Sequence, residues 1–224
     1  MITGWLGILP LAISGLALAV SMTTAWLTLF RRGTLRMTRP NVIYFGFDST
    51  PNSPDPKVFL RCLLYSTAAK GQLIENLFVR LKHGETTQNF SIWVYGGTAR
   101  LSRGSGLFVG RDGIATNHHF LMPKDQQSYV FRTGQYDLEV FANLVGKTRP
   151  MSLFKTQLSV TDEQERRLAS KEAGVYFDWG AEAQRYSTYL DTRPVGVSFS
   201  EIEAMLPKLL PPKTTSKQNT RVRK

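Results

Sequence analysis

Short stretches in which apolar and polar residues alternate dominate the middle of the chain. In the clearest of them, residues 136–145, the apolar side chains at every second position would share one face: Tyr136, Leu138, Val140, Ala142 and Leu144. A period of two is typical of a β-strand with one buried face. Similar stretches, separated by turn residues, predict further strands at residues 42–47, 57–65, 73–82, 90–95, 107–109, 114–116, 129–132, 153–160 and 174–179.

The order of these strands indicates the fold class. They follow one another without regular helices between them, which favours an antiparallel sandwich or barrel over alternating strands and helices. We predict a mainly β fold, an antiparallel β-sandwich of the immunoglobulin-like kind, over residues 41–180, although the Cys…Trp…Cys signature is absent. One short helix is expected near residues 161–170, since Thr161 and Gln164 have the spacing of a capping box.

A different pattern occupies residues 1–30, which carry no charged side chain. As a helix rising about 1.5 Å per residue, residues 5–30 would exceed a hydrocarbon core of about 30 Å. We therefore expect a single-pass transmembrane anchor in contact with the lipid bilayer. Trp5 and Trp26 lie near its ends, where aromatic rings favour the headgroup region. A cleaved signal peptide is the alternative, since residues 17–19 fit a cleavage site, but no positive charge precedes Trp5.

The segment after the anchor, residues 31–40, is basic and contains no acid. Its cations are Arg31, Arg32, Arg36 and Arg39. Positive charge beside a span stays on the cytoplasmic side, so we expect the soluble domain to be cytoplasmic. The single Cys62 fits a compartment in which disulfides are rare. An exported domain that faces the cell envelope, on the same anchor in the opposite orientation, is the alternative.

The net charge of +11 is unevenly distributed. Residues 31–40 hold four of the positive charges and residues 205–224 hold six without an acid, so the rest of the chain is close to neutral. Residues 181–224 are predicted to form an extended, basic and largely disordered tail. Both basic flanks would be attracted to anionic lipid. Because the predicted domain has no basic stripe with interleaved aromatics, we expect no nucleic-acid partner.

One stretch carries a resemblance to a known family. Residues 104–119 read Gly-Ser-Gly-Leu-Phe-Val-Gly-Arg-Asp-Gly-Ile-Ala-Thr-Asn-His-His, and the Asp-Gly pair predicts a hairpin turn. The segment resembles the first hairpin of bacterial trypsin-like serine proteases, which implies that His119 would be the general base. No Gly-x-Ser-Gly-Gly turn follows to supply a nucleophile and an oxyanion hole. A decayed trypsin-like hydrolase that uses His119 is therefore the less favoured hypothesis.

His118 and His119 are the remaining possible site. Adjacent residues on a strand point to opposite faces, so the two rings would not bind one metal ion together. His83 is the only other histidine, and a single cysteine cannot complete a zinc site. We predict no metal and no cofactor, and we expect each histidine to be hydrogen-bonded at a strand end.

The other aromatic residues do not by themselves indicate a site. Trp93, Tyr95, Tyr176 and Trp179 are expected in the core of a sandwich rather than in a binding patch. Since the sequence contains no complete catalytic set, we predict that the protein is not an enzyme. The sequence favours a non-enzymatic binding or scaffolding module at the membrane, with an unknown protein partner. One route to such a partner is β-strand addition at an exposed sheet edge.

Overall fold

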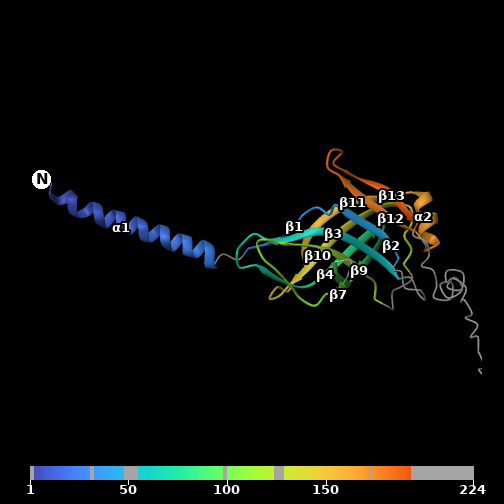
Figure 1. The fold of residues 1–224 in the computed structure, drawn as a ribbon, viewed down its shortest axis with the longest axis horizontal. Coiled ribbons are helices and arrows are strands. Elements are labelled where there is room, and N and C mark those ends of the chain that lie inside the picture. The colour runs from blue at the N-terminus through green and yellow to red at the C-terminus, as the bar shows by residue number, and fades with distance from the viewer. Residues whose placement is uncertain are drawn as a thin grey trace, which may run out of the picture. The chain divides into compact units, whose positions relative to one another are not determined.

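The computed structural model describes residues 3–30, 33–47, 55–97, 100–123, 129–171 and 173–192. An N-terminal apolar helix precedes a mainly β domain of two antiparallel sheets (Figure 1). This confirms the prediction of a mainly β, sandwich-like fold. Most of the predicted tail, residues 193–224, lies outside the described residues, as do Arg31 and Arg32.

The N-terminal segment consists of helix α1 (Thr3–Ala25), which continues as a π-helical stretch η1 (Trp26–Phe30). The stretch Pro10–Thr28 has a mean hydropathy of 1.6, and none of it is buried. Large apolar side chains are exposed along it: Leu11, Ile13, Leu16, Leu18, Val20 and Met22. The helix is long and apolar enough to cross a membrane, a property that anchors and signal sequences share.

The larger sheet, sheet A, has the strand order β13-β12-β2-β3-β9-β6-β7, and β1 also pairs with β3. Its strands are β1 (Leu35–Met37), β2 (Val42–Phe47), β3 (Pro56–Ser66), β6 (Ile92–Gly97), β7 (Arg100–Arg103), β9 (Ile114–Leu121), β12 (Ala173–Gly180) and β13 (Arg185–Thr192). Strands β1, β7 and β13 were not predicted. Since β13 belongs to the sheet, the predicted boundary at residue 180 is wrong and the fold extends to Thr192.

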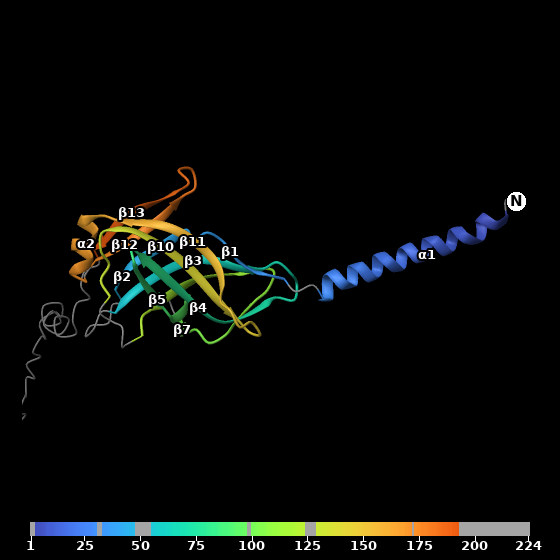
Figure 2. The ribbon, with the colours of Figure 1, turned by 180° about the vertical axis from the view of Figure 1, so that it is seen from behind.

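Sheet B has the order β11-β10-β4-β5, with β8 paired to β4 (Figure 2). Its strands are β4 (Gln72–His83), β5 (Thr86–Phe90), β8 (Leu107–Val109), β10 (Gly134–Leu144) and β11 (Met151–Val160). The apolar side chains that alternate along β10 are all buried in the core, as predicted. The core is continuous, and it joins the inner faces of both sheets.

The chain changes sheets where the sequence predicted one strand at residues 90–95. Phe90 ends β5 in sheet B, and Ile92 begins β6 in sheet A. Only Ser91 separates the two strands, so the backbone itself crosses from one layer to the other. Phe90 and Trp93 on either side of this crossing are fully buried.

The predicted hairpin through Asp112 and Gly113 is wrong. A turn does form there, with Gly113 at a φ of 75°, but β8 pairs with β4 in sheet B and β9 pairs with β3 and β6 in sheet A. The turn therefore moves the chain between sheets. The resemblance to trypsin-like proteases implied a hairpin of these two segments, but the described β8 and β9 do not pair with each other.

Residues 129–132 do not form the predicted strand. They nevertheless fill the core, since the Phe131 ring is fully buried and stacks on Phe45 at 5.3 Å between centroids. The predicted helix is present as α2 (Asp162–Ala169). Its capping box is complete, because the Thr161 hydroxyl accepts from the Gln164 backbone N–H and the Gln164 side chain accepts from the Thr161 N–H.

Candidate functional site

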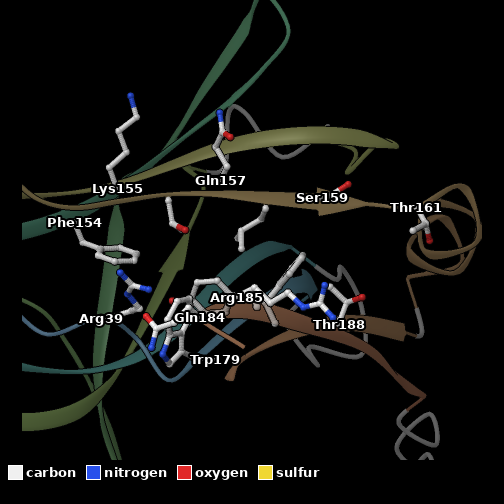
Figure 3. Close-up of a pocket in the computed structure, with 14 residues that line it drawn as sticks. Arg39, Phe154, Lys155, Gln157, Ser159, Thr161, Trp179, Gln184, Arg185 and Thr188 are labelled. Atoms are coloured by element: carbon white, nitrogen blue, oxygen red, sulfur yellow. The ribbon is translucent and has the colours of Figure 1, made fainter. Parts of the chain in front are cut away.

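A cleft of about 520 Å³ lies between β11 of sheet B and β13 of sheet A (Figure 3). Both are edge strands: among the described strands, β11 pairs with β10 alone and β13 with β12 alone. The cleft is lined by Arg39, Phe154, Lys155, Thr156, Gln157, Leu158, Ser159, Thr161, Phe177, Trp179, Gln184, Arg185, Tyr186 and Thr188.

The path of the chain explains why the cleft stays open. Between β11 and β12 the chain forms α2 instead of crossing directly, and Thr161, the N-cap of α2, lies at the cleft. The next turn, residues 181–184, folds β13 back along β12. Two strand edges to which no other described strand pairs therefore face the same space, an arrangement suited to pairing with another extended chain.

Arg39 enters the cleft from an irregular segment between β1 and β2. There the Thr38 hydroxyl accepts a hydrogen bond from the Leu63 N–H at 3.0 Å, and Pro40 supplies no N–H to a ladder. The Arg39 guanidinium carbon lies 3.8 Å from the centroid of the Trp179 ring, a cation–π contact. The Tyr186 hydroxyl donates to the Pro40 carbonyl at 2.8 Å, which fixes the same segment from the other side.

The aromatic side chains of the cleft form a short wall on the hairpin of β12 and β13. Trp179 and Tyr186 are partners in the strand register, and their rings meet edge to face at 5.1 Å between centroids. Burial raises the pKa of Tyr186, an effect that nearby Arg39 opposes in part. The phenol therefore stays protonated and keeps its hydrogen bond at neutral pH.

The cleft carries positive charge. Arg39, Lys155 and Arg185 line it, and none of the described lining residues is acidic. In Figure 3 the side chain of Phe154 reaches toward Arg39, whereas those of Lys155 and Gln157 point away. Arg39 and Arg185 are therefore the cations that remain for the cleft, whose lining also contains hydroxyl side chains and two buried apolar residues, Leu158 and Phe177.

The predicted basic segment, residues 31–40, belongs in part to the folded domain. Arg36 lies exposed on β1, and Arg39 packs on Trp179, so part of residues 31–40 belongs to the sandwich. Trp26 lies in η1 with 64% of its surface exposed. Trp5 lies in α1, near the other end of the apolar helix.

His118 is buried in the core face of β9. Its Nδ1 accepts a hydrogen bond from the Trp93 indole N–H at 3.1 Å, so the neutral ring carries its proton on Nε2. The described residues supply no partner for that Nε2. Burial, together with the charge of His119, lowers the pKa of His118 to about 4. The ring is therefore neutral at physiological pH and closed to solvent.

His119 lies on the opposite face of sheet A, where its ring packs against Phe59 at 4.9 Å between centroids. The structure thus separates the two histidines, as the period of a strand requires. No cluster of three or more metal-binding side chains occurs within the described part of the chain.

The aromatic residues that were expected together in the core do not share one place. Trp93 and Tyr95 stack on each other at 4.8 Å within the sandwich, and Tyr176 lies beside Tyr44 on the outer face of sheet A. Trp179 also lies outside the core, where it forms the aromatic wall of the cleft together with Tyr186. Sequence reasoning missed the cleft because Arg39 and Trp179 are far apart in the chain and no local motif links them.

A second hollow of about 460 Å³ lies on sheet B beside Lys82, His83, Gly84, Gln135, Asp137 and Gln157. Asp137 there accepts a hydrogen bond from the Gln157 side chain at 3.0 Å. His83 stacks on Tyr136 and contacts the Thr133 carbonyl oxygen at 2.8 Å. Because Asp137 and His83 already have partners within the protein, the cleft between β11 and β13 is the stronger candidate.

Comparisons with known proteins identify no family for this chain. No family profile matches the sequence, and no curated protein matches it. Among solved structures, the chain has a distant similarity to a family 123 glycoside hydrolase from Clostridium perfringens, a study of which concerns glycolipid glycan hydrolysis. The sequences are 8% identical, the TM-score is 0.30, and the match covers 58% of this chain but 27% of that chain. A similarity this low carries no argument about activity.

Proposed function

We propose that the protein is a single-pass, membrane-anchored binding module without enzymatic activity, whose β-sandwich recruits or organises a partner protein at the membrane surface. The observation that carries this proposal is the uncharged N-terminal helix, whose large apolar side chains are exposed over residues 10–28. Exposed apolar side chains at this density are unfavourable in water and favourable in a bilayer. We place the soluble domain in the cytoplasm on the basis of the arginines that follow the helix.

The sandwich supports the binding part of this proposal. Two strand edges that pair with no further described strand, and a cleft with arginine and aromatic side chains, are features of recognition surfaces. That the sandwich is immunoglobulin-like remains a prediction within this proposal, and so does the attraction of the basic flanks to anionic lipid.

The anchor is tested by extraction. We expect the full chain to stay in the membrane fraction after alkaline carbonate treatment and to keep the mass of the uncleaved sequence. Replacing Leu16 and Leu18 with lysine should release the protein, because a cation at the centre of a span costs about 2.5–3.5 kcal/mol. Replacing the same two residues with phenylalanine is the control and should leave it in the membrane. A shortened, carbonate-soluble product would identify a signal peptide and refute the anchor.

A further inference from the structure

The cleft between β11 and β13 has the chemistry of a specific kind of partner. It combines two arginines, an aromatic wall and two free backbone edges. We propose that it binds an acidic segment of a partner protein in extended conformation, which adds as a strand to β13 and places its carboxylates beside Arg39 and Arg185. This inference rests on the proposed binding function and names the class of partner.

The backbone edges favour a peptide over other anions. An extended peptide offers N–H and C=O groups in the spacing of a strand, which a sheet edge can pair with. Side chains along the edge of β13 alternate between the two faces, so every second residue of an added strand would face the cleft. The cleft would therefore contact every second side chain of the partner, and we expect these side chains to be acidic or apolar.

The two arginines supply the charge complementarity. Arginine pairs with carboxylates through two parallel hydrogen bonds, and its planar guanidinium stacks favourably on aromatic rings. Arg39 is already held over Trp179, so its guanidinium is positioned before a partner arrives. Pre-positioning of this kind lowers the entropy lost on binding. Because the described lining residues include no acid, nothing among them competes with an incoming carboxylate for Arg39 and Arg185.

The floor of the cleft fits the same partner. Phe177 and Leu158 are buried beneath it, while Thr156 and Thr188 bring hydroxyl groups to its walls. Apolar side chains of the partner would lie on this floor between the carboxylates. A bare anion would use the arginines but would gain nothing from the apolar floor or the strand edges.

The test uses the full chain in nanodiscs of phosphatidylcholine, a lipid with no net charge. The probe is a fluorescent peptide of about ten residues, long enough for a strand, with blocked ends. Glutamate and valine take turns at every second position, with serine between them, so that both side chains share one face. One comparison peptide has lysine in place of glutamate. Two others carry backbone N-methyl groups on alternate residues, one set on each edge of the peptide. Fluorescence anisotropy gives the dissociation constants.

We expect saturable binding of the acidic peptide and none of the lysine peptide. The double variant Arg39→Gln, Arg185→Gln should weaken binding at least about tenfold through the loss of charge-assisted hydrogen bonds. The control variant Arg111→Gln, Arg149→Gln removes two exposed arginines outside the cleft and should change binding less than about twofold. N-methylation of one edge of the peptide should abolish binding, and methylation of the other edge should not.

The single variant Arg185→Gln guards against misfolding, since this exposed side chain is not part of the Trp179 stack. It should weaken binding while the unfolding midpoint stays unchanged. Equal affinities for the double variant and its control, or for the acidic and lysine peptides, would overturn the inference. Binding to phosphatidylserine vesicles through the same arginines, without peptide binding, would also overturn it and assign the cleft to lipid headgroups. In each case carbonate resistance would still stand as evidence for the anchor, so the two failures are distinguishable.

Discussion

The two sides of the sandwich are built in opposite ways. On one side the chain crosses directly from β5 to β6, and Trp93 fills the space behind the crossing with 1% of its surface exposed. On the other side β11 and β13 end their sheets without pairing to each other, and Trp179 lies partly exposed against Arg39. The same residue type thus serves as core on the closed side and as surface on the open side.

This difference separates stability from recognition within one small fold. The closed side contains the tightly packed groups: Trp93, its hydrogen-bonded partner His118, and Gly104, where an added Cβ would overlap the Trp93 ring. The open side contains exposed arginines and free strand edges. Substitutions should therefore reduce stability on the closed side and affect binding on the open side.

The two tryptophans give the largest contrast. Trp93→Ala should reduce the free energy of unfolding by about 3–5 kcal/mol, because it empties a filled space in the core. Trp179→Ala should cost about 1 kcal/mol, since it removes a partly exposed contact. Urea unfolding of the full chain in mild detergent, followed by circular dichroism, measures both. Equal losses of unfolding free energy for the two variants would show that the open side contributes as much to stability as the closed side.

His118 should give the closed side a pH dependence. Its pKa is lowered from 6.5 to about 4 in the folded state, so between these values the unfolded chain binds a proton that the folded chain does not. Stability should therefore fall as the pH drops from 6.5 toward 4, by roughly 3 kcal/mol, and this contribution should level off below that.

The variant His118→Asn isolates this effect, because asparagine keeps an acceptor for Trp93 but does not titrate. Its unfolding free energy should lose the steep slope between pH 6.5 and 4, whereas His119→Asn should retain most of it, because burial is the larger cause of the lowered pKa of His118. A slope that persists in His118→Asn would assign the acid sensitivity to other groups.

Two glycine-to-alanine substitutions, which each add one methyl group, test how tightly the closed side is packed. Gly104→Ala should cost about 1–3 kcal/mol, because the new Cβ overlaps the Trp93 ring and the packed surroundings must shift. Gly110→Ala is the matched control, since its Cβ would meet only an ordinary contact 3.9 Å from Phe108. Thermal melting that showed the same shift for both glycines would contradict the tight packing behind Trp93.

The arginines of the open side should matter least for stability. Arg39→Gln should lower the free energy of unfolding by about 0.5–1 kcal/mol through the lost cation–π contact. Arg185→Gln should change it by less than about 0.5 kcal/mol, as is usual for exposed side chains. Chemical unfolding checks both, and a loss as large as that of Trp93→Ala would show that the cleft is structural.

Local patterns in the sequence predicted most of the described strands but not their partners. Alternation of apolar and polar residues identifies a strand because successive side chains point to opposite faces, one buried and one exposed, as in β10. Pairing depends on residues far away in the chain, which is why the turn at Gly113 predicts a hairpin although β8 and β9 join different sheets. Helix α2 was predictable because its capping box is contained in four consecutive residues.

The candidate site was the least predictable part. Strand β13 has mostly exposed side chains, so its pattern resembles that of a polar tail. In the sequence, Arg39 is one of four arginines after the apolar segment, and its contact with Trp179 exists only once β2 pairs with β12. A cleft formed between the edges of two sheets leaves no local signature.

Membrane topology is the most direct test of the central claim, and the chain suits it because it has one cysteine. Cys62 is buried, and burial raises its pKa to about 12, so the folded protein should give no background with maleimides. Lys147→Cys adds one exposed thiol outside the cleft. In intact cells a membrane-impermeant maleimide should leave this thiol unlabelled, and labelling should appear after permeabilisation. Labelling in intact cells would contradict the cytoplasmic, membrane-anchored module and favour an exported domain.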